Sequence, residues 1–211
     1  MPTVTGLDAD ARQAGGVRVG LDGASFATVA AEDVRPLGLQ VGAVLSAAAV
    51  AEVERRAEAF STRRAALRIL TLRALPSREI RQRLVRKGFA PAAVDEAVGA
   101  LLDAGLVNDH EFALHYARTR ARRFRYGPGR LVRDLVRLGI GEKEAREAVA
   151  AALELEGVEA VDLLKEAAAK KLRGLTGLDA ATRRRKLKIY LLRRGFAASD
   201  VIEVVKAAVA G

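Results

Sequence analysis

The chain has 211 residues and a formal net charge of +10; half of its residues are apolar, 4% are aromatic, and none is cysteine or tryptophan. This length and composition exclude a disordered chain and allow one medium domain or two small ones with a buried core. The absence of cysteine excludes a disulfide scaffold, a cysteine nucleophile, a cysteine-ligated zinc ion and an iron–sulfur cluster.

Residues 1–60 predict a small unit that contains a β-hairpin. Apolar residues alternate with others over residues 17–21, which is the period of a half-buried strand. Asp22-Gly23 is a strong two-residue turn signal because glycine accepts a positive φ, and residues 24–29 follow as the second strand. Residues 4–7 predict one further short strand.

Two helices are expected after the hairpin, the first over residues 31–37, closed by Gly38, and the second over residues 47–60. Two or three strands alone are only marginally stable in water. We therefore expect this unit to pack against the rest of the chain or against a partner.

The remainder of the chain is an internal repeat. One pattern occurs three times, at residues 84–89, 135–140 and 191–196: two apolar residues, a basic residue, a variable residue, glycine and a large apolar residue. A set of five apolar residues that share one helical face begins six residues after each glycine. The three sets are Val94, Ala97, Val98, Leu101 and Leu102; Ala145, Ala148, Val149, Ala152 and Leu153; and Val201, Val204, Val205, Ala208 and Val209.

Each copy is expected to fold as three helices. The second helix of each copy ends at Lys87, Leu138 or Arg194, the following glycine takes the left-handed conformation, and the third helix begins shortly after it. The first helices are predicted over residues 61–75, 108–125 and 158–173. Pro76 ends the first of these, and the run from Asn108 to Glu111 resembles a capping box at the start of the second.

The sequence therefore predicts a mainly α fold. Three tandem three-helix repeats form an elongated curved array, preceded by a small N-terminal unit that contains the β-hairpin. The predicted boundaries are residues 1–60 for the N-terminal unit and 61–107, 108–156 and 157–211 for the repeats. Because no repeat buries much apolar surface alone, stacking of neighbours is expected to complete the core.

The excess of positive over negative charge is confined to the repeats. Residues 1–60 hold 5 basic and 8 acidic side chains, whereas residues 61–211 hold 31 and 18, a net charge of +13. A clustered positive excess favours nucleic acid or another polyanion as the partner. The alternative is a solvated surface whose extra arginine reflects a GC-rich coding bias.

An arginine-rich segment, residues 118–130, is the sharpest candidate site. Six of its thirteen residues are arginine and none is acidic. The planar guanidinium suits phosphate oxygens, and aromatic rings stack on bases or on arginine. The predicted nucleic-acid or filament-binding residues here are Arg118, Arg120, Arg122, Arg123, Arg125, Tyr126 and Arg130. In the alternative interpretation, Phe124 belongs to the core and the arginines coat a helix, some of them paired with glutamate.

A second basic region follows in the third repeat. Part of it lies at the start of a predicted helix, where cations oppose the helix dipole, so local helix stability does not explain them. The predicted binding residues here are Lys170, Lys171, Arg183, Arg184, Arg185, Lys186 and Lys188. The alternative is a solvated helix start.

The sequence shows no convincing catalytic or metal-binding set. His110 and His115 are five residues apart, about 140° around a helix, so they do not converge on one ion. No Ser-His-Asp arrangement and no phosphate-binding G-x-x-x-x-G-K-[ST] motif is present. We expect no cofactor, no metal and no enzymatic activity.

Nothing in the sequence indicates a membrane. Its start lacks a basic region followed by an apolar run, and its longest charge-free stretch, residues 36–51, is 16 residues long and too short to span a bilayer. We therefore expect a soluble, cytoplasmic protein without a signal peptide.

Taken together, these residues resemble the RecX family, regulatory partners of the RecA recombinase. The resemblance covers residues 61–209 and rests on the three basic-X-Gly-apolar turns, on the Leu-Val-Asn-Asp-x-x-Phe-Ala run at 106–113, and on the arginine-rich stretch leading to Gly127 and Arg130. The second turn departs from the other two, with Leu138 and Ile140 in place of a basic residue and Phe. It is less basic, so equivalent contacts by all three copies are not expected.

The resemblance implies a non-enzymatic, mainly negative regulator that acts in DNA repair, homologous recombination and the SOS response. Such a protein binds the RecA–DNA filament and restrains its growth, ATP hydrolysis, strand exchange and coprotease activity. The expected partners are the RecA filament and single-stranded DNA, with double-stranded DNA as a further partner, and the expected state is a monomer. The alternative is a stand-alone basic DNA-binding protein, architectural or transcriptional, built of helix-turn-helix-like repeats.

Overall fold

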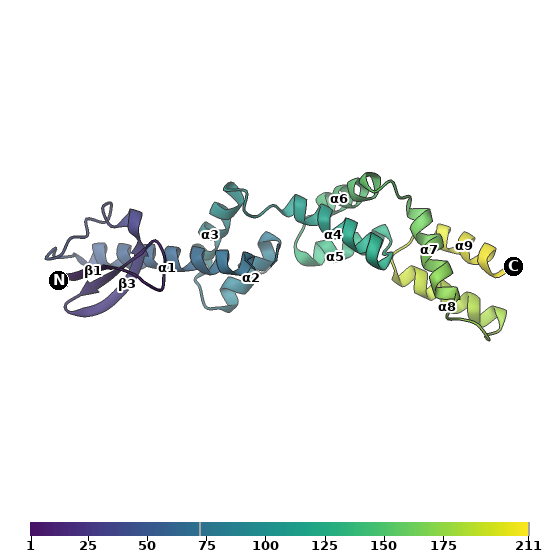
Figure 1. The fold of residues 1–211 in the computed structure, drawn as a ribbon, viewed down its shortest axis with the longest axis horizontal. Helices are drawn as coiled ribbons and strands as arrows, with labels where there is room; N and C mark the ends of the chain where they lie inside the picture. The colour runs from purple at the N-terminus through teal and green to yellow at the C-terminus, as the bar shows by residue number, and fades with distance from the viewer. Residues whose placement is uncertain (72, 211) are drawn as a thin grey trace. The chain divides into compact units, whose positions relative to one another are not determined.

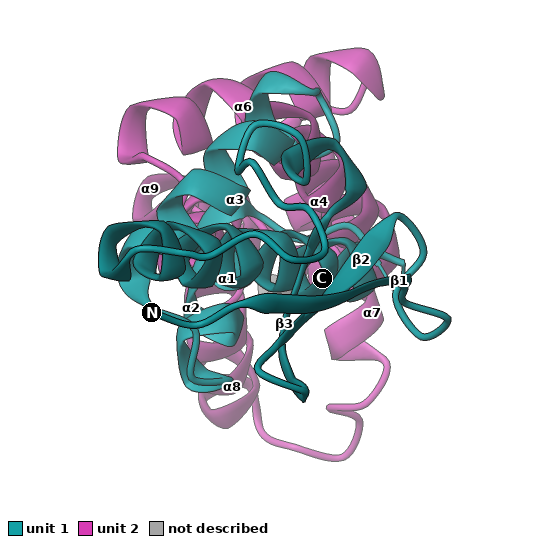
Figure 2. Ribbon diagram, turned by 90° about the vertical axis from the view of Figure 1, so that its left-hand side faces the viewer, with its two compact units in different colours: residues 1–107 teal, residues 108–211 magenta. Residues whose placement is uncertain are grey.

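The structure is a computed structural model that describes residues 1–71 and 73–210, with side chains through residue 208 (Figure 1). The side chain of Val209, the last apolar residue of the third set, and Gly211, the last residue of the predicted third repeat, lie outside the described residues. Two compact units divide the chain, Met1–Val107 (unit 1) and Asn108–Gly211 (unit 2) (Figure 2). The predicted boundaries after residues 60 and 156 fall inside these units and stay predictions.

Unit 1 begins with a three-stranded antiparallel sheet in the order β1 (Val4–Ala9), β2 (Gly16–Leu21) and β3 (Ala24–Ala30). The turn between β2 and β3 has a positive φ at both central residues, 49° at Asp22 and 82° at Gly23. This combination matches the twist of a two-stranded hairpin. The predicted hairpin and the additional first strand are therefore confirmed.

The helix expected over residues 31–37 is wrong in length, since only a 3-10 turn, η1 (Ala31–Asp33), is formed. Pro36 has no backbone N–H to continue a helical ladder. Gly38 nevertheless closes the segment with φ 63°.

The helices expected over residues 47–60 and 61–75 are one continuous helix, α1 (Ala47–Leu70). The separate start predicted at Ser61 is wrong, because the hydroxyls of Ser61 and Thr62 donate back to the carbonyl of Glu58 inside the helix, at 2.9 and 2.7 Å. Such bonds satisfy a serine or threonine within a helix without capping it. Pro76 does not end α1, which stops at Leu70; instead it precedes the next helix.

The repeat helices otherwise follow the predicted pattern. Within the described residues they are α2 (Ser77–Arg86), α3 (Pro91–Asp103), α4 (Asp109–Phe124), α5 (Pro128–Leu138), α6 (Glu142–Leu155), α7 (Ala160–Leu172), α8 (Ala180–Arg193) and α9 (Ala198–Ala210). Gly88, Gly139 and Gly195 have φ values of 91°, 98° and 85°. The predicted left-handed turn is thus present in all three copies.

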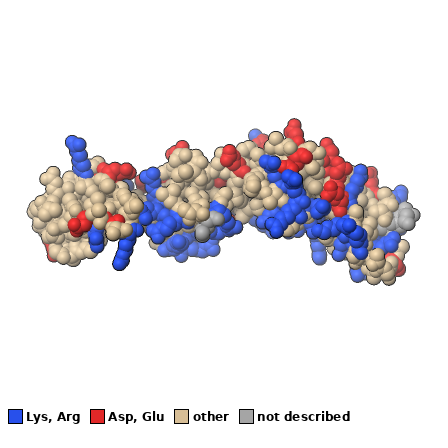
Figure 3. Space-filling model, in the orientation of Figure 1, with Lys and Arg blue, Asp and Glu red and all other residues tan. Residues whose placement is uncertain are grey.

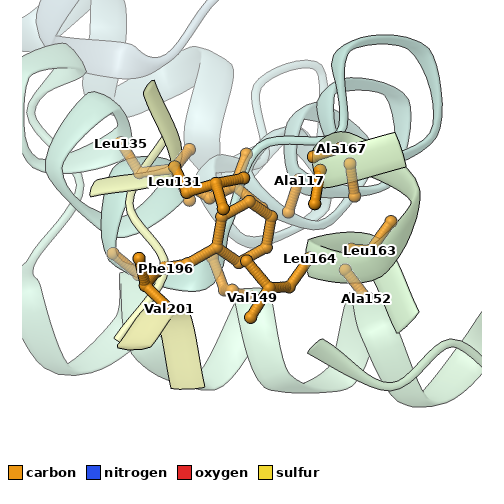
Figure 4. Packing of buried hydrophobic residues seen from close by; sticks show 14 of the residues in the cluster. Ala117, Leu131, Leu135, Val149, Ala152, Leu163, Leu164, Ala167, Phe196 and Val201 are labelled. Carbon is orange, nitrogen blue, oxygen red and sulfur yellow. The ribbon is translucent and has the colours of Figure 1, made fainter. Parts of the chain in front are cut away.

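Buried apolar residues of the described chain form three clusters. The first joins the sheet to the N-terminal half of α1 and includes Val19, Val29 and Val53. The second joins the C-terminal half of α1 to α2 and α3. The third is shared by the second and third repeats, and Figure 4 shows Phe196 of the third repeat packed together with Leu131 and Val149 of the second. The expected sharing of a core is thus found between repeats two and three.

Candidate nucleic-acid interface

The loop between α4 and α5 is held against the glycine turn after α8. The N–H of Gly127 donates to the carbonyl of Arg194 at 2.8 Å, and the N–H of Gly129 donates to the carbonyl of Gly195 at 3.0 Å. A Cβ added to Gly195 would lie 2.2 Å from the backbone nitrogen of Arg130. This close approach brings the arginine-rich segment of the second repeat next to the basic residues of the third.

Two tyrosines lie at this junction, and cations cover their rings. The guanidinium of Arg130 lies 3.8 Å from the ring centre of Tyr126, and that of Arg194 lies 5.2 Å from it. Arg194 also lies 4.8 Å from the ring centre of Tyr190, while the ammonium group of Lys171 lies 5.4 Å from that ring. Arg194 therefore connects both tyrosines within one cationic site.

A cavity of about 370 Å³ lies beside these rings, and Arg130, Lys171, Tyr190 and Arg194 line it, whereas Tyr126 does not. None of the described residues that line it is acidic, and the one ion pair that reaches it joins Arg130 to Asp134 at 3.5 Å. We call the set the two-tyrosine cluster; it consists of Tyr126, Arg130, Lys171, Lys186, Tyr190, Arg193 and Arg194. It holds five cations against one paired carboxylate, so its charge is strongly positive.

A row of aromatic rings and arginine side chains continues from this cluster along α4. Phe124 stacks on Tyr126 with ring centres 5.5 Å apart, and Arg123 lies 5.4 Å from the ring centre of Phe124. Arg120 lies between the rings of Tyr116 and Phe124, at 5.1 and 5.2 Å. Burial, assisted by the nearby Asp134 carboxylate, raises the pKa of Tyr116, so its phenol stays neutral.

Three of the predicted arginines are instead paired with carboxylates of unit 2. Arg118 and Arg122 both contact Glu156, at 2.7 and 3.3 Å, and Arg125 contacts Glu166 at 2.7 Å. Their charge is therefore partly neutralised inside the unit. The side chain of Arg122 is still 72% exposed. Glu156 directly follows α6, and Glu166 lies on α7. Figure 3 shows acidic side chains gathered over α6 and basic ones on the side of unit 2 that carries α5 and α8.

The remaining predicted residues lie outside the cavity. Lys170, Arg184, Arg185 and Lys188 are exposed, and none of them has an acidic partner within 4 Å in the part of the chain that the structure describes. Arg183 is half-buried, and its Nε has no hydrogen-bond partner. The structure thus separates Lys171 and Lys186, which join the cluster, from their neighbours in sequence.

Four residues of this surface were not predicted as binding residues: Tyr116, Tyr190, Arg193 and Arg194. The sequence carries a signal for two of them, since Lys186, Tyr190 and Arg194 recur every four residues on one face of α8. The pairing with Tyr126 is not visible in the sequence, because it depends on the long-range contact between two loops.

The described residues contain no group of three or more histidine, aspartate or glutamate side chains that could hold a metal ion. Across the same residues, no helix combines the length and the apolar character that crossing a membrane requires.

Three family models match the chain in the order of its repeats. They describe the first, second and third three-helix domains of RecX and match residues 63–101, 108–149 and 158–205. A curated relative from Halorhodospira halophila, named regulatory protein RecX, is 34% identical over 157 residues, which are 74% of this chain and 92% of the relative. The chain belongs to the RecX family.

Other RecX proteins extend this comparison. A regulatory protein RecX from Pelodictyon phaeoclathratiforme is 32% identical over 62% of this chain and 78% of its own length. The crystal structure of a regulatory protein RecX matches 98% of this chain and all of its own with a TM-score of 0.80, at 24% identity, and so shows the same fold. RecX from Lactobacillus salivarius matches 71% of the chain with a TM-score of 0.61.

Proposed function

We propose that this protein is a non-enzymatic, mainly negative regulator of the RecA recombinase. It binds the RecA–DNA filament in the cytoplasm and restrains filament growth, ATP hydrolysis, strand exchange and coprotease activity during DNA repair and the SOS response. Family membership supports the regulatory role. The two-tyrosine cluster, which combines basic residues of two repeats, is the observation that carries the contact with the filament.

Ring contacts fix the position of Arg130 and Arg194 within the cluster. A guanidinium stacked on a ring uses its π-face for the contact and leaves its N–H donors in the plane free for phosphate oxygens. Arg118, Arg122 and Arg125 are all paired with glutamates, whereas among the cluster cations only Arg130 has a carboxylate partner in the described residues, Asp134. We therefore assign the principal contact, with phosphate or with an acidic protein surface, to the cluster. We assign a secondary contact to Arg184, Arg185 and Lys188, the exposed cations of α8 outside the cluster.

The first test measures single-stranded-DNA-dependent ATP hydrolysis by RecA of the same organism, titrated with this protein. Strong inhibition well below one molecule per RecA protomer supports a filament regulator, because competition for DNA alone would need far more protein. If the wild-type chain has no effect on RecA while it binds DNA directly, the proposal is wrong. A stand-alone DNA-binding protein whose affinity falls steeply with salt would then be the better description.

The contribution of the cluster is tested with the double variant K186Q/R193Q. Both side chains are exposed and line the cavity, so their loss removes two cations without opening the core. We expect half-maximal inhibition to need about tenfold more protein, since each phosphate contact contributes about 1 kcal/mol or less at physiological salt. The control K143Q/K206Q removes the same charge from α6 and α9 and should match the wild type. Equal behaviour of the two double variants would remove the cluster from the proposal.

A further inference from the structure

Unit 1 holds a second cationic cavity, which the proposed function does not use. It has a volume of about 660 Å³ and lies where three elements of unit 1 meet. The loop between β1 and β2 contributes Arg12 and Gln13; α1 contributes Ser61, Ala65 and Arg68; and the glycine turn after α2 contributes Lys87 and Phe89. No residue of the two-tyrosine cluster takes part.

The cavity gathers three cations without a carboxylate. Arg12, Arg68 and Lys87 are exposed, and within the described residues none of them has an acidic partner within 4 Å. None of the described lining residues is acidic. Like charges that converge on one cavity repel each other, and an anion bound between them relieves that repulsion.

Hydrogen bonds fix the walls of the cavity. The guanidinium of Arg64 on α1 donates to the carbonyl of Ala14 at 2.7 Å and so ties the β1–β2 loop to the helix. Asp10 organises the same loop by accepting from the backbone N–H of Arg12 at 2.9 Å and from the hydroxyl of Thr28 at 3.0 Å. These bonds lower the pKa of Asp10, the backbone N–H first.

The opposite wall is held in the same way, because the N–H of Ala90 donates to the carboxylate of Glu58 on α1 at 3.0 Å. The nearby carboxylates of Asp10 and Glu58 therefore accept hydrogen bonds that position the walls of the cavity. A site that is built before its ligand arrives loses less entropy on binding.

Phe89 distinguishes this turn from its two repeats. The equivalent residues Ile140 and Phe196 are buried in the core, with 3% and 6% exposure. Phe89 is only half-buried and lines the cavity beside Lys87. Phe89 also packs against the buried cluster of the first repeat, but unlike its two equivalents it keeps part of its ring exposed beside cations.

We propose that this cavity binds a nucleotide, with its phosphate between Arg12, Arg68 and Lys87 and its base against Phe89. The volume lies within the range of about 300–1,000 Å³ that is typical of small-ligand sites, and exceeds what a phosphate alone needs. Arginine supplies forked donors for phosphate oxygens, and aromatic rings accept any base by stacking. The nucleotide is either free in solution or one unit of a single strand.

The experiment is a titration of the ¹⁵N-labelled full chain followed by amide chemical shifts. The probes are ATP, inorganic phosphate and a short oligothymidylate, because this readout locates weak binding. We expect the amides of Gln13, Ala65 and Phe89 to shift and saturate. The variant R68Q/K87Q should weaken binding about tenfold, whereas R63Q/R86Q, which removes the same charge from exposed positions of α1 and α2 outside the cavity, should not.

The outcomes separate the two sources. Saturable ATP binding that R68Q/K87Q weakens identifies a free nucleotide, and binding of the oligothymidylate alone with the same dependence identifies a strand. The variant F89L should weaken the binding of ATP or the oligothymidylate and leave that of inorganic phosphate unchanged. The proposal is overturned if no probe shifts these amides, or if both double variants weaken binding equally. RecA is absent, so the result does not depend on the proposed regulation.

Discussion

Equivalent glycines of the repeats have different surroundings. Gly88 and Gly195 both follow the second helix of a repeat and have φ values of 91° and 85°. Nothing lies within 4 Å of a Cβ added to Gly88, whereas one added to Gly195 would collide with the backbone of Arg130. Gly88 is needed only for the left-handed turn. Gly195 is needed for its turn and for the close backbone contact that assembles the two-tyrosine cluster.

This difference predicts unequal costs for the same substitution. G88A should reduce the free energy of unfolding by about 1 kcal/mol, the cost of the left-handed conformation for alanine. G195A should cost about 1–3 kcal/mol more, because the added methyl group must displace packed backbone. Urea denaturation of both variants checks this, and equal losses would mean that the α4–α5 loop moves away at little cost.

At the residue scale, the sequence predicts what is local and misses what is distant. The left-handed glycines follow from a pattern of six neighbouring residues, and Lys171 and Lys186 were included as basic residues. Arg194 was assigned only to a helix end. Its position between Tyr126 and Tyr190 results from hydrogen bonds across 67 residues, from Gly127 to Arg194, and no periodicity reports such a contact.

Two helices that carry the candidate interface begin with a capped N-terminus. On α4 the side chain of Asn108 accepts from the N–H of Glu111 at 3.0 Å, as the sequence predicts. On α8 the carboxylate of Asp179 accepts from the N–H of Thr182 at 2.9 Å. This bond is the main reason that the pKa of Asp179 lies below its ordinary value of 3.8. The two caps differ in that only Asp179 titrates.

The caps should therefore respond differently to pH. N108A should lower the free energy of unfolding by about 1 kcal/mol at every pH, since an amide cap does not titrate. The loss caused by D179A should be full above pH 3.8 and shrink as the pH falls further, because protonation through the lowered folded pKa removes the stabilisation in the wild type. Urea denaturation over a pH series compares the variants; a pH-independent effect of D179A would contradict this role for the carboxylate.

At the element scale, the start and end of most helices could be predicted because capping residues, glycine and proline act over one turn. The segment over residues 31–37 is one exception, and α1 is another, because Ser61 resembles a helix start. The hydroxyls of Ser61 and Thr62 both donate to the carbonyl of Glu58 inside the helix, and the preceding residues continue the helix without a break. A cap and an internal serine are alike in sequence and differ only in which backbone group the hydroxyl meets.

At the scale of the whole molecule, the buried clusters predict which parts of the chain fold independently. The second and third repeats share one core, in which Phe196 packs with residues of the second repeat. A fragment of residues 108–211 should therefore unfold cooperatively, whereas residues 157–211 alone should lack partners for their buried face and stay largely unfolded. Thermal melts followed by circular dichroism test both fragments. Cooperative melting of the shorter fragment at the same midpoint would make the third repeat an autonomous domain.

The continuity of α1 has a consequence for how unit 1 tolerates change. One rod carries the sheet on its first half and the first repeat on its second half, so the two are set in rotational phase by the number of residues between them. Each residue inserted or removed near Phe60 would turn one against the other by about 100° and swing Arg12 away from Arg68. Exposed side chains along this helix can vary. Its length is expected to change only by nearly whole turns, because only such changes keep the sheet and the first repeat in the same relative orientation.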